Sequence, residues 1–152
     1  MDPTPINPTI MNAPDSAGNG SRGQAEPLRA RSLSASLTVK DIAKSMAWYR
    51  DAAGFTVDQR HEREGTLRSV VLTAGDVRLL LNQDDGAKGT DRVKGAGFSL
   101  MVTTTQSVDA IARRIRDHGT PLESEPADMP WGMRMFRVHD PDGFNLAFGS
   151  PL

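Results

Sequence analysis

The same succession of expected elements occurs twice in the chain, in about residues 33–83 and again in about residues 96–149. Each copy begins with alternating apolar and polar side chains. It continues with apolar residues at helical spacing and ends in three further strand-like stretches. One βαβββ module leaves a sheet face and a helix stripe uncovered, so two copies must pack together. The repeat predicts an α+β fold in which two βαβββ modules form curved mixed sheets around a cavity, with the helices outside.

The first module is delimited by cap and turn residues. Residues 33–39 alternate between apolar and mostly hydroxyl side chains, which is the period of a half-buried strand. Asp41 is a suitable N-cap for a helix, and Gly54 is a suitable residue for the end of that helix. Further strands are expected at residues 55–61, 67–73 and 77–81.

The second module follows a polar linker at residues 84–95, which contains three of the glycines. Residues 97–102 alternate as a strand does. A helix is expected from about Ser107 to His118, with Gly119 ending it. The remaining strands are expected at residues 122–125, 133–138 and 145–148.

Residues 1–31 differ in composition from the rest of the chain. They hold five of the ten prolines and few large apolar residues, too few to offset the entropy lost on ordering. We expect a disordered tail over residues 1–31 and a folded domain over residues 32–152. The tail lacks the basic start and apolar centre of a secretory signal, which favours a cytoplasmic protein. Translation from Met11, a dispensable extension and a functional tail all remain open.

The composition excludes several classes of function. The formal charge of -1 comes from 18 basic and 19 acidic residues, so no excess of positive charge favours a nucleic-acid backbone. No apolar run approaches the ~20 residues that a membrane-spanning helix needs. The chain has no cysteine, which excludes disulfides, thiolate metal sites and a cysteine nucleophile. No nucleophile elbow or phosphate-binding loop is present either. We therefore expect no nucleic-acid partner and no membrane partner.

Two stretches of sequence resemble a known family. The first comprises residues 37–42 (Leu-Thr-Val-Lys-Asp-Ile), 45–50 (Ser-Met-Ala-Trp-Tyr-Arg) and 53–55 (Ala-Gly-Phe). The second comprises residues 131–136 (Trp-Gly-Met-Arg-Met-Phe) and 140–143 (Asp-Pro-Asp-Gly). With these motifs the chain resembles the glyoxalase / bleomycin-resistance / extradiol-dioxygenase superfamily, also called vicinal oxygen chelate. The resemblance implies a small-molecule ligand and a homodimer with its pocket at or near the subunit interface.

The resemblance also implies where a metal would be held. Metal-using members place His, Gln or Glu on the first and last strands of each module, around one divalent ion. The matching positions here are Ser34, Leu80, Gly97 and Ala147, and the residues beside them are not ligands either. Each of the three histidines fits a loop edge or a helix end. We predict no catalytic metal and no cofactor.

Strand alternation assigns a lining to the expected cavity. The lining combines small and hydroxyl side chains with adaptable methionines, an aromatic ring and two arginines. Such a surface offers flat apolar contacts and suits a ligand with anionic or carbonyl groups. The resemblance implies that the ligand is a planar or peptide-like antibiotic, as in the branch of the family that sequesters such molecules. The residues expected to bind ligand are Ser34, Ser36, Arg78, Ser99, Met101, Trp131, Met135, Arg137 and Asn145.

Three classes of function remain open. The leading hypothesis is a metal-free protein that binds a small molecule and sequesters an antibiotic or a metabolite without chemistry. The alternative is a lyase, isomerase or dioxygenase-like enzyme of the same fold with a substituted site. Its acid–base groups would come from Arg137, His139 or loop carboxylates. The third is a regulatory or accessory protein that acts through its tail or its dimer surface.

Overall fold

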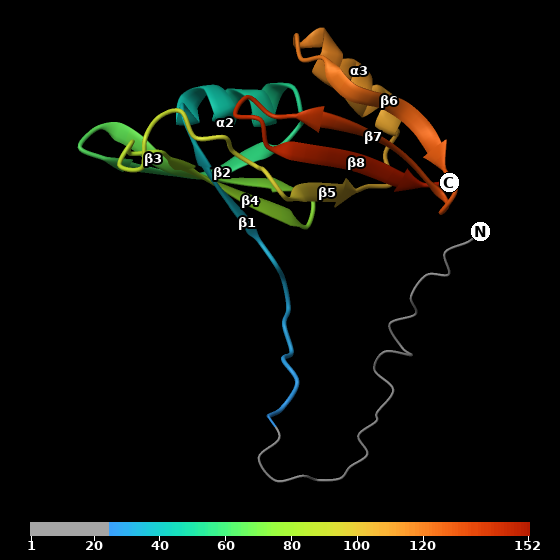
Figure 1. Cartoon of the computed structure of the whole chain (residues 1–152), viewed down its shortest axis with the longest axis horizontal. Helices are drawn as coiled ribbons and strands as arrows, with labels where there is room; N and C mark the ends of the chain where they lie inside the picture. Colours follow the sequence, from blue (N-terminus) through green and yellow to red (C-terminus); the bar gives the residue numbers. More distant parts are fainter. Residues whose placement is uncertain (1–24) are drawn as a thin grey trace. The chain divides into compact units, whose positions relative to one another are not determined.

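The computed structural model of the protein describes residues 25–152 (Figure 1). The expected tail of residues 1–31 therefore lies mostly outside the described residues. Residues 25–33 contain no helix or strand, and their side chains are exposed. No helix of the described part is long and apolar enough to cross a membrane.

The first module forms a four-stranded mixed sheet in the order β1-β4-β3-β2. The outer pair β1 and β4 is parallel, and the other two pairs are antiparallel. Its elements are β1 (Ala35–Val39), α2 (Ile42–Asp51), β2 (Thr56–Arg63), β3 (Thr66–Ala74) and β4 (Val77–Gln83).

The second module repeats this arrangement in a sheet of order β5-β8-β7-β6, again with one parallel pair and two antiparallel pairs. The prediction of two βαβββ modules in an α+β fold is confirmed. The elements are β5 (Ser99–Thr103), α3 (Val108–Asp117), β6 (Leu122–Met129), β7 (Met133–His139) and β8 (Asn145–Pro151).

Some strand boundaries differ from the expected ones for identifiable reasons. Leu33 was expected to begin the first strand, but it lies outside β1 and is 97% exposed, because pairing with β4 begins at Ala35. β6 continues past residue 125 through Pro126. A proline is tolerated there because β6 is an edge strand and its register with β7 shifts between Ser124 and Ala127.

Both helices cover the same side of the two sheets (Figure 1). α2 packs on the strands of the first sheet and α3 on those of the second. In β1 the alternation is direct, since Leu37 and Val39 are buried whereas Ser36 and Thr38 are exposed. The core side chains of both modules form one continuous cluster beneath the helices. The sheets are not closed into a barrel, so the face opposite the helices, which was expected to line a cavity, is open in the single chain.

A buried carboxylate joins the two modules. The hydroxyl of Tyr49, on α2, donates to Asp140 Oδ2 at 2.7 Å. Asp140 Oδ1 accepts from the backbone N–H groups of Asp142 and Phe144 at 2.8 and 2.9 Å. Asp142 Oδ2 in turn accepts from the backbone N–H of Lys40 at 2.8 Å. Residues 140–143, which the sequence identifies only as a turn, therefore also hold the two modules together.

Burial dominates the electrostatics of this junction. Removal from water raises the pKa of Asp140, although the hydrogen bonds from Tyr49 and from the turn act in the opposite direction. Burial and the neighbouring carboxylate of Asp140 raise the pKa of Tyr49 well above its usual value, so the phenol keeps its proton.

We expect Ser45→Ala to raise the free energy of unfolding by about 1 kcal/mol. Ser45 is fully buried on α2, and its Oγ has no hydrogen-bond partner among residues 25–152. Alanine removes this unpaired group and is a better helix former. Urea denaturation measures the change. Ser107→Ala is the control of opposite sign, because the Ser107 side chain caps α3 and its loss costs about 1 kcal/mol. A loss of stability in Ser45→Ala would contradict the assignment.

We expect Asp140→Asn to change how stability depends on pH. A carboxyl whose pKa is higher in the folded state takes up protons on folding. Its contribution is complete below about pH 4, its unfolded pKa, and is lost as the pH rises through the folded-state value. The free energy of unfolding of the native protein minus that of the variant should therefore fall as the pH rises above about 4. Urea denaturation at a series of pH values above about 4 measures it, and a difference that rises with pH would contradict the raised pKa.

Candidate functional site

Most of the residues expected to bind ligand lie on the open face of the second sheet. Backbone pairing arranges this face in rows, because directly paired residues point to the same side. The alternate residues of the same strands, such as Val102, Phe136 and Leu146, face α3 and belong to the core. The rows on the open face are Thr103 with Gly149 and Met135, Met101 with Ala147 and Arg137, and Ser99 with Asn145 and His139.

Methionines cover one end of this face. A Cβ atom placed on Gly149 would lie 2.6 Å from Met101 Cε and 2.8 Å from Met133 Cε, so both methyl groups rest over the glycine. Met101 is 46% exposed, whereas Met135, beside Gly149, is 5% exposed. We call Met101, Met133, Met135 and Gly149 the methionine surface. Trp131, 55% exposed, lies in the turn between β6 and β7 at the same end of the sheet.

Basic side chains follow the methionines along β7, in the middle row and the end row of the face. Arg137 is exposed and forms no ion pair within residues 25–152. His139 follows on the same face, with its Nε2 3.7 Å from Glu123 Oε2. Arg134 points to the opposite side of β7 and donates to Asp109 at 2.8 and 2.9 Å, which raises the pKa of Arg134. The two arginines of one strand thus differ, since one is neutralised and the other faces the open side with a free charge.

Two of the expected ligand contacts have structural partners. Asn145 Nδ2 donates to the backbone oxygens of Gly95 and Phe98, both at 3.2 Å, and thereby holds the linker against β8. Ser36 Oγ accepts from Asn82 Nδ2 at 2.8 Å. These polar groups are only partly available to a ligand.

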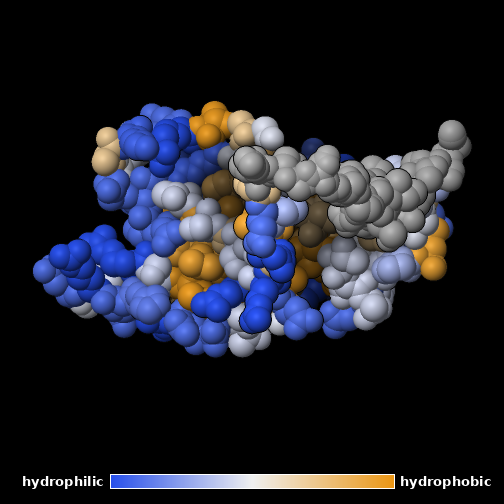
Figure 2. Space-filling model, turned by 90° about the horizontal axis from the view of Figure 1, so that it is seen from below, coloured by the Kyte–Doolittle hydropathy of each residue, from blue (hydrophilic) through white to orange (hydrophobic). Residues whose placement is uncertain are grey.

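The three remaining predicted residues belong to the first sheet or its approach. Ser36 and Arg78 lie on the open face of that sheet, and Ser34 immediately precedes β1. No hydrogen bond or ion pair of the described residues links these three with the predicted residues of the second sheet. The single chain therefore presents two open faces. Figure 2, which views the molecule from below, shows hydrophobic residues in the middle of this side with hydrophilic residues around them.

The residues at the expected metal positions do not fit a metal. In the structure Leu80 pairs with Ser36, and Ala147 pairs with Met101. The first-strand positions opposite Leu80 and Ala147 are therefore Ser36 and Met101, and not Ser34 and Gly97 as the sequence predicts. A serine hydroxyl, a thioether and two aliphatic side chains do not form the imidazole and carboxylate set that such an ion requires. Within residues 25–152 no three His, Asp or Glu side chains are grouped to hold an ion.

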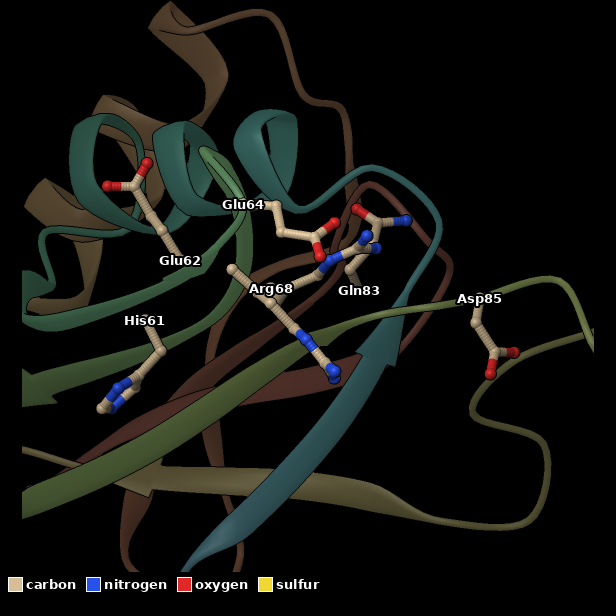
Figure 3. Close-up of a pocket in the computed structure, with 7 residues that line it drawn as sticks. His61, Glu62, Glu64, Arg68, Gln83 and Asp85 are labelled. Carbon is tan, nitrogen blue, oxygen red and sulfur yellow. The ribbon is translucent and has the colours of Figure 1, made fainter.

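A pocket that was not predicted lies at the β2–β3 hairpin (Figure 3) and has a volume of about 530 Å³. Arg68 is an extra residue of β3, because His61 pairs with Ser69 and Glu62 with Leu67. The side-chain amide of Gln83 already has hydrogen-bond partners. Its oxygen accepts from the backbone N–H of Ile42, and its nitrogen donates to the backbone oxygens of Lys40 and Asp84. All seven residues that line the pocket are polar or charged: His61, Glu62, Arg63, Glu64, Arg68, Gln83 and Asp85.

Sequence reasoning missed Gly149 and this pocket for different reasons. The alternation that runs from Asn145 through Ala147 extends to Gly149, so a longer final strand would have included it. The bulge at Arg68 has no counterpart in the hydrophobic pattern of the hairpin, so no signal in the sequence predicts it.

Comparison with known families and structures gives a consistent result. Residues 31–148 match the profile of the glyoxalase/bleomycin resistance protein/dioxygenase superfamily. A search of curated proteins found no significant match.

Among solved structures, TioX from Micromonospora sp. ML1 is 22% identical, with 81% of this chain and 100% of that chain covered and a TM-score of 0.66. TnmS3, an antibiotic binding protein from Streptomyces sp. CB03234, is 22% identical, with coverage of 84% and 100% and a TM-score of 0.65. A glyoxylase/bleomycin resistance protein/dioxygenase domain from Frankia sp. EAN1pec is 20% identical, with coverage of 82% and 94% and a TM-score of 0.68. At these identities the likeness establishes a shared fold.

We expect two glycine substitutions to have unequal effects. Gly95→Ala should lower the free energy of unfolding by about 2 kcal/mol, because Gly95 has a φ of +80° and its new Cβ would meet Phe144 Cα at 2.9 Å. Gly149→Ala should cost less than about 1 kcal/mol, because the atoms in its way are the mobile ends of Met101 and Met133. Urea denaturation measures both, and methyl NMR should show Met101 and Met133 shifting in Gly149→Ala. Equal losses would mean that the methionines are rigidly packed.

Proposed function

The chain belongs to the glyoxalase/bleomycin resistance protein/dioxygenase superfamily, and we propose that it binds a small molecule on its open sheet faces without a metal and without changing the molecule chemically.

The chemistry of the paired positions on β1–β4 and β5–β8 carries this proposal. Ser36 with Leu80 and Met101 with Ala147 offer no carboxylate or imidazole. Beside them the methionine surface presents thioethers over a glycine, and Met101 is nearly half exposed. Methionine side chains adapt to flat or irregular apolar bodies. Such a surface is better suited to binding a ligand than to activating one of its bonds for reaction.

The role that follows is sequestration of an antibiotic or a metabolite. TnmS3, which shares the fold, is described as an antibiotic binding protein. A planar or peptide-like ligand would lie on the methionine surface, with Trp131 at its edge and polar groups of the ligand towards Arg137. Binding of this kind is stoichiometric and consumes no co-substrate.

A homodimer is part of the proposal. The open faces leave Met101 and Trp131 exposed, and each sheet is covered by a helix on one side only. A sheet with one solvated apolar region favours a covering partner. A second copy over this side would enclose the ligand that the single chain leaves exposed.

One observation favours a second candidate, an enzyme of the same fold. The imidazole of His139 faces the same side as Arg137 and lies 3.7 Å from Glu123. A carboxylate beside an imidazole supports its action as a base. A lyase or isomerase would use His139 to move a proton of a substrate held near Arg137.

Native mass spectrometry of the full-length protein tests the proposal. We expect a dimer without a bound divalent ion, and one planar antibiotic recovered unchanged per subunit after incubation with a panel that includes bleomycin. Met101→Gln should weaken that binding at least tenfold. Val93→Gln, which replaces an exposed apolar side chain of the linker, is the matched control. Turnover of a methylglyoxal–glutathione adduct or of a catechol on addition of divalent metal would contradict the proposal. Conversion of a panel member that is lost in His139→Gln would favour the enzyme.

A further inference from the structure

We infer, resting on the proposed function, that the ligand of the second sheet is an amphiphilic anion, with an apolar body on the methionine surface and one acidic group at Arg137.

The order of side chains along β7 carries this inference. Met133, Met135, Arg137 and His139 follow one another on the open face, from the apolar end of the sheet to the charged end. Residues two apart on a strand are about 7 Å apart. The apolar surface and the guanidinium are thus separated by about the length of one or two aromatic rings.

The methionines supply the apolar contact surface for the body of a ligand. Ala147 and Gly149, on the inner strand β8, are buried, and the methyl groups of Met101 and Met133 lie over Gly149. A flat body can therefore rest on these methyl groups with its end next to Arg137.

The charge balance of the neighbouring strand leaves Arg137 available. Each of three carboxylates on β6 already faces a basic group: Glu123 lies near His139, Glu125 pairs with Arg116 and Asp128 pairs with Arg134. Arg137 has no such partner within residues 25–152, although it is exposed on the same sheet. A guanidinium binds a carboxylate or another oxyanion through two parallel hydrogen bonds.

Two probes of equal shape separate the parts of this inference. We would titrate the full-length protein with 2-naphthoate and with its neutral amide, 2-naphthamide, by calorimetry at pH 7. The naphthoate should bind about tenfold more tightly, because a charge-assisted contact to Arg137 adds to the same apolar contact. The preference should shrink as salt is added.

Four variants assign the contributions of Arg137 and of the methionine surface. Arg137→Gln should abolish it and leave the affinity for 2-naphthamide within about twofold, while Arg137→Lys should keep part of it. Arg113→Gln removes the same charge from an exposed position on α3 and should keep the preference intact. Met101→Gln should weaken both probes alike.

The outcomes distinguish this inference from the proposed function. Equal binding of the two probes, or a preference that survives in Arg137→Gln, would overturn the inference while the binding function stands. If neither probe binds while a member of the antibiotic panel does, the inference fails and the binding function stands. If neither the probes nor the panel bind, both fail.

Discussion

The buried carboxylate of Asp140 is the contact on which the candidate site depends. Its Oδ1 accepts from Phe144 N–H, and its own N–H donates to Phe144 O at 3.0 Å, so it closes the turn between β7 and β8. That turn sets the register in which Arg137 faces Ala147 and Met135 faces Gly149. A slip of one residue would send these side chains to the opposite side of the sheet. Through Tyr49 the same carboxylate also ties this register to the helix layer of the first module.

The proposed binding function rests on which side chains the paired strands bring to the open faces. The pairs β1–β4 and β5–β8 place a serine, a leucine, a methionine and an alanine there. None of these four side chains is an imidazole or a carboxylate. Arg137, which is exposed and has no ion pair within residues 25–152, lies on the same face as the methionine. In the proposed function this charge would orient the ligand, and shape together with one ionic contact would set specificity.

Much of the fold was predictable because it rests on short-range patterns. Alternation in residues 33–39 and 97–102, the cap at Asp41, the helix expected from about Ser107 and the glycine after each helix are local signals. Each marks an element of the structure, although β1 begins at Ala35 and β5 at Ser99. The faces of Ser99, Met101, Met135 and Arg137 followed from strand period alone. What local signals did not predict was pairing: Leu33 lies outside β1, β6 continues through Pro126, and Arg68 is an extra residue in β3.

The sequence by itself determined the two-module fold and the chemistry available to the open faces, since period, caps and side-chain type are properties of neighbouring residues. Only the tertiary structure decided which of those side chains are free to act. Asn145 and Ser36 form hydrogen bonds with protein groups far away in the sequence. The charge of Arg134 is neutralised by a carboxylate on α3, whereas the charge of Arg137 is not neutralised. Whether a polar group has a partner depends on contacts between distant segments. Those contacts exist only after the sheets have formed and the turn at Asp140 has set their register.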